Sequence, residues 1–191
     1  MDAIREIDGL LESDDPSGWA YENLDLVGEG HHAMVYRHPL RDDMVIRVAP
    51  FPEGFFGHAA EADDPCASPH APLCHAVALV EDTLVGACER LEPVRDDDRE
   101  AAGWIAVARQ VVLGRADSVD PSALAAFRLA QPGFEEFARS LGPEASDLRD
   151  ENWLLRGRTL VLNDPVPMMP PEAARRVEAA ALGMTEMAVS P

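Results

Sequence analysis

The chain has 191 residues and a formal net charge of −19, from 16 Lys and Arg against 35 Asp and Glu. Its length fits one domain or two small lobes, and a hydrophobic fraction of 47% is enough to build a core. The negative charge repels nucleic-acid phosphates and argues against direct nucleic-acid binding. Apolar runs fall short of the roughly 18 residues of a membrane span, and the acidic start is unlike a signal peptide. We expect a cytoplasmic protein without a membrane partner.

Three cysteines are too few, and odd in number, for a disulfide framework, so reduced thiols are expected. A proline-containing loop brings two of them close in sequence to histidines, in the pattern C-x3-H-x3-C-H. The four residues are Cys66, His70, Cys74 and His75. This spacing differs from those of structural zinc sites, and we interpret the four as scattered loop residues.

The first half of the chain has the pattern of one helix followed by short strands. Apolar residues at helical spacing predict a helix over 4–11, which the turn-forming segment 14–18 is expected to end. Further elements are predicted as strands over 21–27, 33–37 and 44–49, a short helix near 57–62, and a hairpin over 76–80 and 83–90. Short strands separated by frequent turns are typical of an antiparallel sheet.

The second half has a helical pattern. Helices are predicted over 101–113, 121–129, 134–141 and 170–182, and a small hairpin over 153–155 and 159–162. A charged linker over 95–100 separates the two halves. The predicted organisation is an N-terminal helical extension over 1–20, a β-rich part over 21–94 and a helical part over 95–191.

Two glycines mark the loop between the first two predicted strands after residue 20. The segment runs from Leu26 to Tyr36 and contains Gly28-Glu29-Gly30. Glycines at such a loop let the backbone approach a phosphate closely. A dinucleotide-binding interpretation is disfavoured, because that motif needs a helix after the loop, and here a strand follows.

A cation and two acids follow in a characteristic order. Arg47 lies in the middle of the apolar strand Val45-Ile46-Arg47-Val48-Ala49, where a charge needs a buried partner or an anionic ligand. Asp147 and Asn152 then stand five residues apart, directly before the predicted small hairpin, and Asp164 follows that hairpin. Acid, amide, hairpin and second acid is the kinase order of catalytic base, metal-holding Asn and metal-holding Asp.

Over residues 21–166 the chain resembles the protein-kinase-like superfamily, most closely small phage-type kinase-like proteins with a D-L-x-x-x-N element and a terminal D-P. The resemblance implies an α+β, two-lobed fold with an antiparallel N-lobe sheet and a reduced helical C-lobe. It also implies a role for each motif residue. Gly28 and Gly30 would cover phosphates, and Arg47 would take the place of the phosphate-pairing lysine, with Glu61 as the acid that pairs with it. Glu89 and Leu91 would flank an adenine at the hinge between the lobes. Asp147 would accept a hydroxyl proton, and Asn152 and Asp164 would hold Mg²⁺.

Two specific functions remain open at this point, beside an unrelated role on the same scaffold, since a fold does not fix a function. The first is an ATP- and Mg²⁺-dependent phosphotransferase that acts on a protein or small-molecule hydroxyl. The second is a catalytically inactive, pseudokinase-like inhibitor, phage-encoded and of the anti-CRISPR type, whose acidic surface binds a basic nucleic-acid-binding partner in the host cytoplasm. The second rests on the net charge and on departures from the kinase pattern, such as Arg47 in place of lysine.

Other interpretations of single residues carry less weight. Asp147 and Asp164 could form a paired-carboxylate hydrolase site, but nothing else in the sequence indicates a sugar substrate. His31 and His32 are expected at the tip of the glycine loop, facing solvent or a phosphate. Met168 and Met169 are expected either to pack where the rest of a full-length helical lobe would lie or to form an exposed partner patch.

Overall fold

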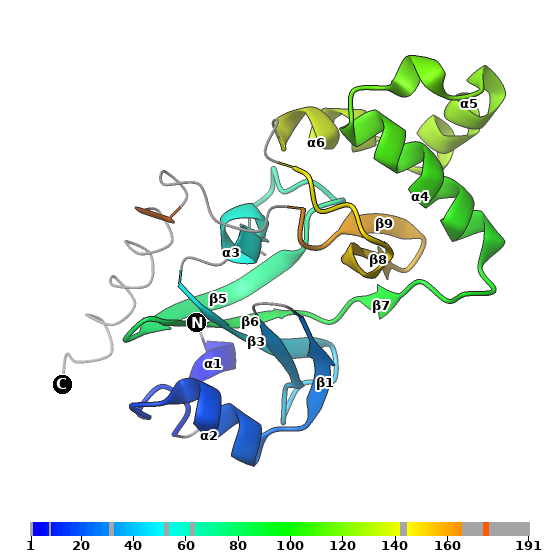
Figure 1. The fold of residues 1–191 in the computed structure, drawn as a ribbon. Helices are drawn as coiled ribbons and strands as arrows, with labels where there is room; N and C mark the ends of the chain where they lie inside the picture. Colours follow the sequence, from blue (N-terminus) through cyan, green and yellow to red (C-terminus); the bar gives the residue numbers. More distant parts are fainter. Residues whose placement is uncertain are drawn as a thin grey trace. The chain divides into compact units, whose positions relative to one another are not determined.

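The computed structural model describes residues 2–7, 9–30, 33–51, 54–61, 64–141, 145–165 and 174–175. The chain forms two compact units (Figure 1), and one of the places where it passes from one to the other lies between Arg90 and Leu91. Unit 1 comprises Met1–Pro65, Leu73–Arg90 and Met168–Pro191, and unit 2 comprises Cys66–Pro72 and Leu91–Pro167.

Unit 1 is built on a six-stranded sheet. In spatial order its strands are β1 (Leu26–Glu29), β2 (Met34–Arg37), β3 (Met44–Pro50), β6 (Thr83–Glu89), β5 (Leu73–Val80) and β4 (Ala60–Glu61). Neighbouring strands run antiparallel, except that the short β4 runs parallel to β5. The predicted α+β class with an antiparallel sheet in the first half is therefore confirmed.

The core of unit 1 lies on both faces of this sheet, because successive side chains of a strand point to opposite faces. On one face Ile46 and Val48 of β3 pack with apolar residues of α1 (Asp2–Arg5) and α2 (Pro16–Asn23). On the other face Ala49 packs with α3 (Gly54–His58). In Figure 1 α3 lies on the side of the sheet opposite to α1 and α2. Side chains that are neighbours in a strand point to opposite faces, so Arg47 lies on the α3 face.

The start of the chain differs from its predicted form. The helix predicted over 4–11 lasts one turn, although Ile4, Ile7 and Leu10 are all buried as that pattern requires. The strand predicted over 21–27 is wrong in its first residues, because α2 continues to Asn23 and β1 begins only at Leu26. The segment 14–18, which was expected to end the first helix, instead contains the start of α2.

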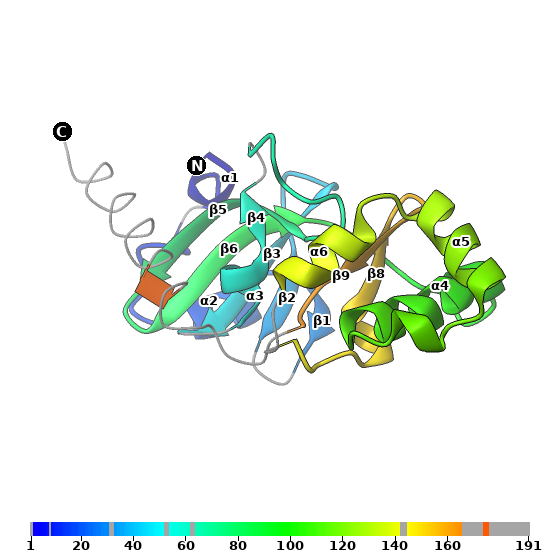
Figure 2. The same ribbon diagram turned by 90° about the horizontal axis from the view of Figure 1, so that it is seen from above.

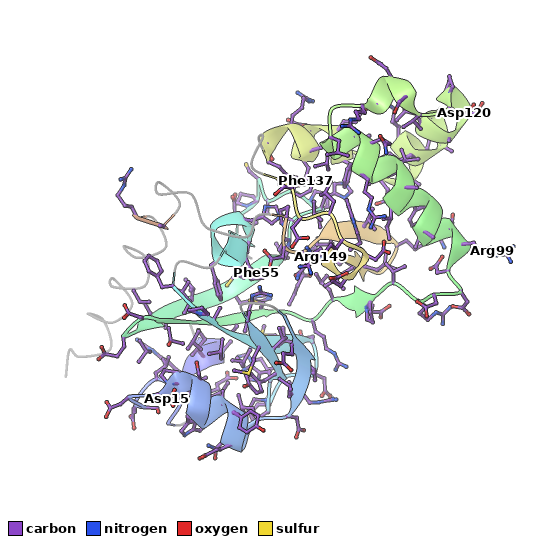
Figure 3. All side chains as sticks on the ribbon, in the orientation of Figure 1. Asp15, Phe55, Arg99, Asp120, Phe137 and Arg149 are labelled. Carbon is purple, nitrogen blue, oxygen red and sulfur yellow. The ribbon has the colours of Figure 1, made fainter. Side chains whose placement is uncertain are left out.

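This second helix has a clear start signal. The carboxylate of Asp15, which is labelled in Figure 3, accepts a hydrogen bond from the Gly18 amide at 3.0 Å, and Pro16 stands at the first helical position. An aspartate cap followed by proline is a favoured beginning of a helix. The short helix predicted near 57–62 is also displaced, because α3 covers Gly54–His58.

The described residues of unit 2 form three α-helices, two short 3-10 helices (η) and a three-stranded sheet. The elements are β7 (Glu92–Pro93), α4 (Arg99–Val112), η1 (Ala116–Ser118), α5 (Pro121–Ala130), α6 (Phe134–Ser140), η2 (Asp150–Asn152), β8 (Trp153–Arg156) and β9 (Thr159–Leu162). The three predicted helices of this part and the small hairpin are confirmed within one or two residues. In Figure 2 α4 lies beside α5 and α6, against which it packs.

An aromatic cluster forms the centre of unit 2. The Phe134 ring contacts those of Phe127, Phe137 and Trp153 at centroid distances of 5.2, 5.7 and 6.2 Å. His70 is fully buried against Phe134, and its ring nitrogens lie 2.8 Å from Leu160 O and 3.0 Å from Pro132 O. These contacts place the segment Cys66–Pro72 in unit 2, although its sequence neighbours belong to unit 1.

Some predictions lie outside the described residues. They concern His31, His32, Met168, Met169 and the helix over 170–182, of which only 174 and 175 are described. Among the residues that are described, no helix has the length and apolar character needed to span a bilayer.

Candidate functional site

The hairpin β8–β9 brings the two predicted acidic motifs of unit 2 side by side. Gly157, at φ +62°, makes the tight turn that reverses the chain. Beyond the hairpin, the backbone amides of Ser146 and Asp147 both donate to Pro165 O, at 3.0 and 3.1 Å. The loop that carries Asp147 therefore lies against the segment that carries Asp164, although the two acids are far apart in sequence.

Asn152 holds these two segments together. Its buried amide nitrogen donates to Asp147 O at 3.0 Å and to Asp164 O at 2.9 Å. Its backbone carbonyl accepts a hydrogen bond from Asn163 N at 2.8 Å. Both amide hydrogens thus serve the backbone, which leaves the side-chain oxygen as the atom that could bind a cation.

Asp147 is clamped by a neighbouring arginine. Arg149, which is labelled in Figure 3, donates from Nε and Nη2 to the two carboxylate oxygens of Asp147 at 2.7 and 2.8 Å. This is the bidentate geometry of a strong ion pair. This Arg149 hydrogen bond lowers the pKa of Asp147, against an opposing effect of burial, and an interaction with Asn152 lowers it further. Asp147 is therefore a carboxylate throughout the neutral range.

The loop 147–152 is also fixed from α4 and β8. Arg109 Nε donates to Leu148 O at 2.8 Å, and its Nη2 forms an ion pair with Asp150. Trp153 Nε1 donates to the same Leu148 carbonyl at 3.3 Å. Sequence reasoning missed Arg109, because an arginine in an amphipathic helix gives no sign of the loop that it contacts.

Asp164 and Asn152 supply oxygen ligands suited to Mg²⁺. Asp164 is half-buried, and its Oδ1 atom is inaccessible to solvent. Magnesium is bound in proteins through one or two carboxylates together with substrate phosphates. A carboxylate and a carboxamide oxygen on adjoining segments fit that requirement. Within the described ranges, no group of three or more His, Cys, Asp or Glu is placed to bind a metal by itself.

The glycine loop belongs to unit 1. Gly28 lies near the end of the edge strand β1, after a register shift, and the Gly30 amide donates to Ala33 O at 2.8 Å. Neither glycine adopts a positive φ, and a Cβ would lie 3.8 Å from its nearest neighbour at Gly28 and 3.5 Å at Gly30. The fold therefore tolerates a side chain at both positions, which favours a functional reason for glycine.

Arg47 lies in the middle of β3, opposite Val35 and Gly86, and is only 7% exposed. Its guanidinium carbon lies 4.2 Å from the centroid of the Phe55 ring, a cation–π contact on the α3 face. The predicted partner Glu61 is in β4, but its side chain lies outside the described residues. The pairing of Arg47 with Glu61 stays a prediction.

The two predicted hinge residues fall on different units. Glu89 ends β6 in unit 1, and its carboxylate accepts a hydrogen bond from Leu73 N at 2.8 Å. Leu91 is the first residue of the second stretch of unit 2. The predicted site residues are thus divided. Unit 1 holds Gly28, Gly30, Arg47 and Glu89, and unit 2 holds Leu91, Asp147, Asn152 and Asp164.

The four residues of the C-x3-H-x3-C-H pattern are divided in the same way. Cys66 and His70 belong to unit 2, whereas Cys74 and His75 belong to β5 of unit 1. The imidazole of His70 is already held by two backbone carbonyls. Its contacts give it a structural role, which is to join its loop to β9.

No family model and no curated protein matches this sequence. Among solved structures, the chain is similar to a thermostable mutant of aminoglycoside phosphotransferase APH(4)-Ia in a ternary complex with ADP and hygromycin B. The identity is 20% and the TM-score 0.31, over 56% of this chain and 39% of that one. A second mutant of that enzyme, with AMP-PNP and hygromycin B, gives 21% identity and a TM-score of 0.31, over 61% and 41% of the two chains. This chain spans about two fifths of those enzymes, and its function has to be argued from its own residues.

Proposed function

We propose that this chain is a kinase-like nucleotide-binding protein that transfers a phosphoryl group from ATP, with Mg²⁺, to a hydroxyl of a protein or small molecule. One observation carries the proposal: the Asn152 amide joins the backbone of Asp147 to that of Asp164. The three residues that the resemblance implies for catalysis and metal binding are thereby held together in unit 2 by direct hydrogen bonds.

Asp147 has the properties needed to orient an attacking hydroxyl. Aspartate is ionised at neutral pH, and Arg149 lowers the pKa of Asp147 further. Its carboxylate therefore accepts a hydrogen bond from the hydroxyl of an acceptor rather than donating one. Phosphoryl transfer needs little basicity, because its catalysis consists mainly of positioning and electrostatic stabilisation. The rigid loop anchored by Arg109 and Trp153 supplies the positioning.

Asn152 and Asp164 would hold the magnesium ion, through the side-chain oxygen of the first and the carboxylate of the second. When bound, Mg²⁺ neutralises charge on the nucleotide phosphates. The protein needs this neutralisation, since its own net charge of −19 opposes the approach of ATP. In unit 1, Gly28 and Gly30 would let the β1–β2 loop approach phosphates, and Arg47 would supply a fixed positive charge.

Nucleotide binding is the first test. Titration calorimetry with ATP and Mg²⁺ should give saturable binding, and the unfolding temperature should rise with nucleotide concentration. The Asp164→Asn variant should lose the dependence on Mg²⁺, and Gly28→Ala should weaken binding without lowering stability. Absence of both binding and thermal shift at millimolar ATP and Mg²⁺ would contradict the proposal.

Catalysis is tested separately on a set of hydroxyl acceptors with γ-labelled ATP. We expect transfer to be lost in Asp147→Asn, while nucleotide affinity is kept, because Asp147 would contact the acceptor rather than the nucleotide. Equal transfer by this variant and the unaltered protein would remove Asp147 from the proposed site.

The net charge of −19 supports a second proposal, an inhibitor that occupies the nucleic-acid groove of a basic protein. Its test is displacement of labelled DNA from basic DNA-binding proteins, with an effect that weakens as salt rises. Charge reversal should use the exposed Asp96 and Asp117, since Asp98 caps α4 by accepting from Ala101 N at 3.0 Å. Displacement of DNA that is unchanged both by added salt and by charge reversal would contradict this proposal.

A further inference from the structure

Two cysteines face each other across neighbouring strands of unit 1. Cys74 of β5 is paired in register with Cys88 of β6, and their Sγ atoms lie 3.8 Å apart. The Cys88 thiol donates toward Cys74 Sγ, and the Cys74 thiol donates to Ala76 O at 3.1 Å. The two sulfur atoms are therefore in contact as thiols.

A bulge in β5 creates this arrangement. Ala76 pairs with Ala87, and both belong to the core on the α1–α2 face of the sheet. Strict alternation would place Cys74 on that same face, but the register shifts by one residue between Cys74 and Ala76. The shift turns Cys74 to the α3 face, where Cys88 is part of the core with Phe56.

The strand pairing also provides the spacing of a disulfide. Directly opposed residues of an antiparallel pair have Cα atoms about 4.5–5.5 Å apart. Disulfides span Cα distances of about 4.4–6.8 Å, with an S–S bond of about 2.05 Å. Side-chain rotation is therefore sufficient to close the remaining gap between the sulfurs, without a change in strand pairing.

We propose that Cys74 and Cys88 form a reversible disulfide when the protein meets a hydroperoxide or a comparable two-electron thiol oxidant. Cys74 is half-buried and Cys88 only 3% exposed, so the oxidant reaches Cys74 first. The Cys74 thiol is oxidised to a sulfenic acid as the peroxide O–O bond breaks, and the peroxide leaves as an alcohol or water. Cys88 then attacks the Cys74 sulfur, the S–S bond forms, and the hydroxyl leaves with the Cys88 proton as water.

The test counts thiols and maps disulfides in the whole protein. After oxidation of the folded protein and removal of the oxidant, thiols are counted in denaturant, where all three cysteines react. We expect the Cys66→Ser variant to fall from two thiols to none without a disulfide between chains, with a mass lower by two hydrogens. Peptide mapping should find one linked pair, Cys74–Cys88, and a dithiol reductant should restore both thiols.

Variants that also carry Cys66→Ser, and the unaltered protein, give the control. With Cys74→Ser the buried Cys88 should keep its thiol under the same treatment. With Cys88→Ser no disulfide should form, and Cys74 should be found as a sulfenic acid that the dithiol reductant returns to the thiol. Mapping of the unaltered protein needs neither variant to fold, so its result stands even if Cys88→Ser is unstable. Retention of both thiols, their separate overoxidation, or linkage between chains would overturn the proposal.

Discussion

At the scale of single residues, the candidate site depends on side chains that fix other parts of the site by hydrogen bonds. Asn152 is buried and gives both amide hydrogens to carbonyls of the neighbouring motifs. Arg149 gives two hydrogen bonds to the Asp147 carboxylate. A buried polar group costs little stability when it forms all its hydrogen bonds. Removal of one partner leaves the other buried without a hydrogen bond, which lowers the free energy of unfolding.

Asn152→Ala should lower the free energy of unfolding by about 1–3 kcal/mol, because two carbonyls lose their buried donor. Asn152→Asp should cost more at neutral pH, since a carboxylate would face those same carbonyl oxygens. The extra cost should shrink in acid, where a protonated Asp can donate. Chemical denaturation at two pH values measures both variants, and an Asp variant as stable as the unaltered protein at neutral pH would contradict the arrangement.

The clamp on Asp147 should appear as a pH dependence. Its folded pKa is lowered, chiefly by Arg149, so the ion pair stabilises the fold above the ordinary Asp pKa of about 3.9. This contribution is lost as the pH falls through the lower folded pKa. In Arg149→Met the pKa of Asp147 should rise, and the stability difference from the unaltered protein should shrink below about pH 4.

Carboxyl NMR titration of Asp147 measures this shift directly. The matched control is Glu151→Gln, because Glu151 is the second acid paired with Arg149, at 3.0 Å. Removal of Glu151 leaves both Arg149–Asp147 hydrogen bonds in place, so the pKa of Asp147 should stay low. A fall of the pKa in Glu151→Gln as large as its rise in Arg149→Met would show that net charge, rather than the bidentate contact, sets the pKa.

At the scale of elements, the strands and helices of the two units tolerate change very differently. Gly86 lies in β6, paired on both sides by β3 and β5, and a Cβ there would lie 2.2 Å from Phe56 Cε1. Gly103 lies within α4, and a Cβ there would meet nothing within 4 Å. The absence of a side chain at Gly86 lets the Phe56 ring of α3 pack against the sheet, whereas Gly103 makes no such contact.

Gly86→Ala should therefore destabilise the protein by about 1–3 kcal/mol, because the buried Phe56 ring has to move out of its packed position. Gly103→Ala should instead stabilise it by about 0.5–1 kcal/mol, since alanine loses less backbone entropy in a helix. Urea denaturation of this matched pair measures both. Opposite signs are required, and a neutral Gly86→Ala would show that α3 does not pack on β6 as described.

At the scale of the whole molecule, the excess of acids is the dominant electrostatic feature. With 16 Lys and Arg against 35 Asp and Glu, 19 acids would stay unpaired even if each basic residue paired with one acid. Pairs such as Arg128–Glu135 and Arg158–Glu100 are moreover exposed. Exposed pairs contribute about 0–1 kcal/mol each. Self-repulsion among unpaired carboxylates should therefore outweigh them, and it acts against the compact state.

Added salt should consequently stabilise the protein. Raising NaCl from about 0.01 M to 0.1 M shortens the screening length from about 30 Å to about 10 Å. A gain of roughly 1 kcal/mol would raise the unfolding temperature by about 2–4 °C for a chain of this size. Differential scanning calorimetry measures the shift, with an uncharged osmolyte as the control. A fall in the unfolding temperature with NaCl would show that ion pairs, not repulsion, dominate.

Local patterns determined much of this protein from its sequence alone. The α+β class, the strands around Arg47, the β5–β6 and β8–β9 hairpins and the helices of unit 2 all follow from short-range periodicity and turn chemistry. The order of Asp147, Asn152 and Asp164 around a hairpin was readable for the same reason, since a hairpin returns the chain to its starting point. The start of α2 carried a capping signal that was interpreted as a helix end.

Tertiary structure alone decided the contacts that give these residues their roles. Arg109 reaches the loop before β8 only because α4 packs beside it, and His70 joins unit 2 through carbonyls far along the chain. The bulge that sets Cys74 against Cys88 depends on how β5 pairs with β6, which no spacing in the sequence reveals. Side-chain direction in a strand has a period of two, so a one-residue shift in register reverses it.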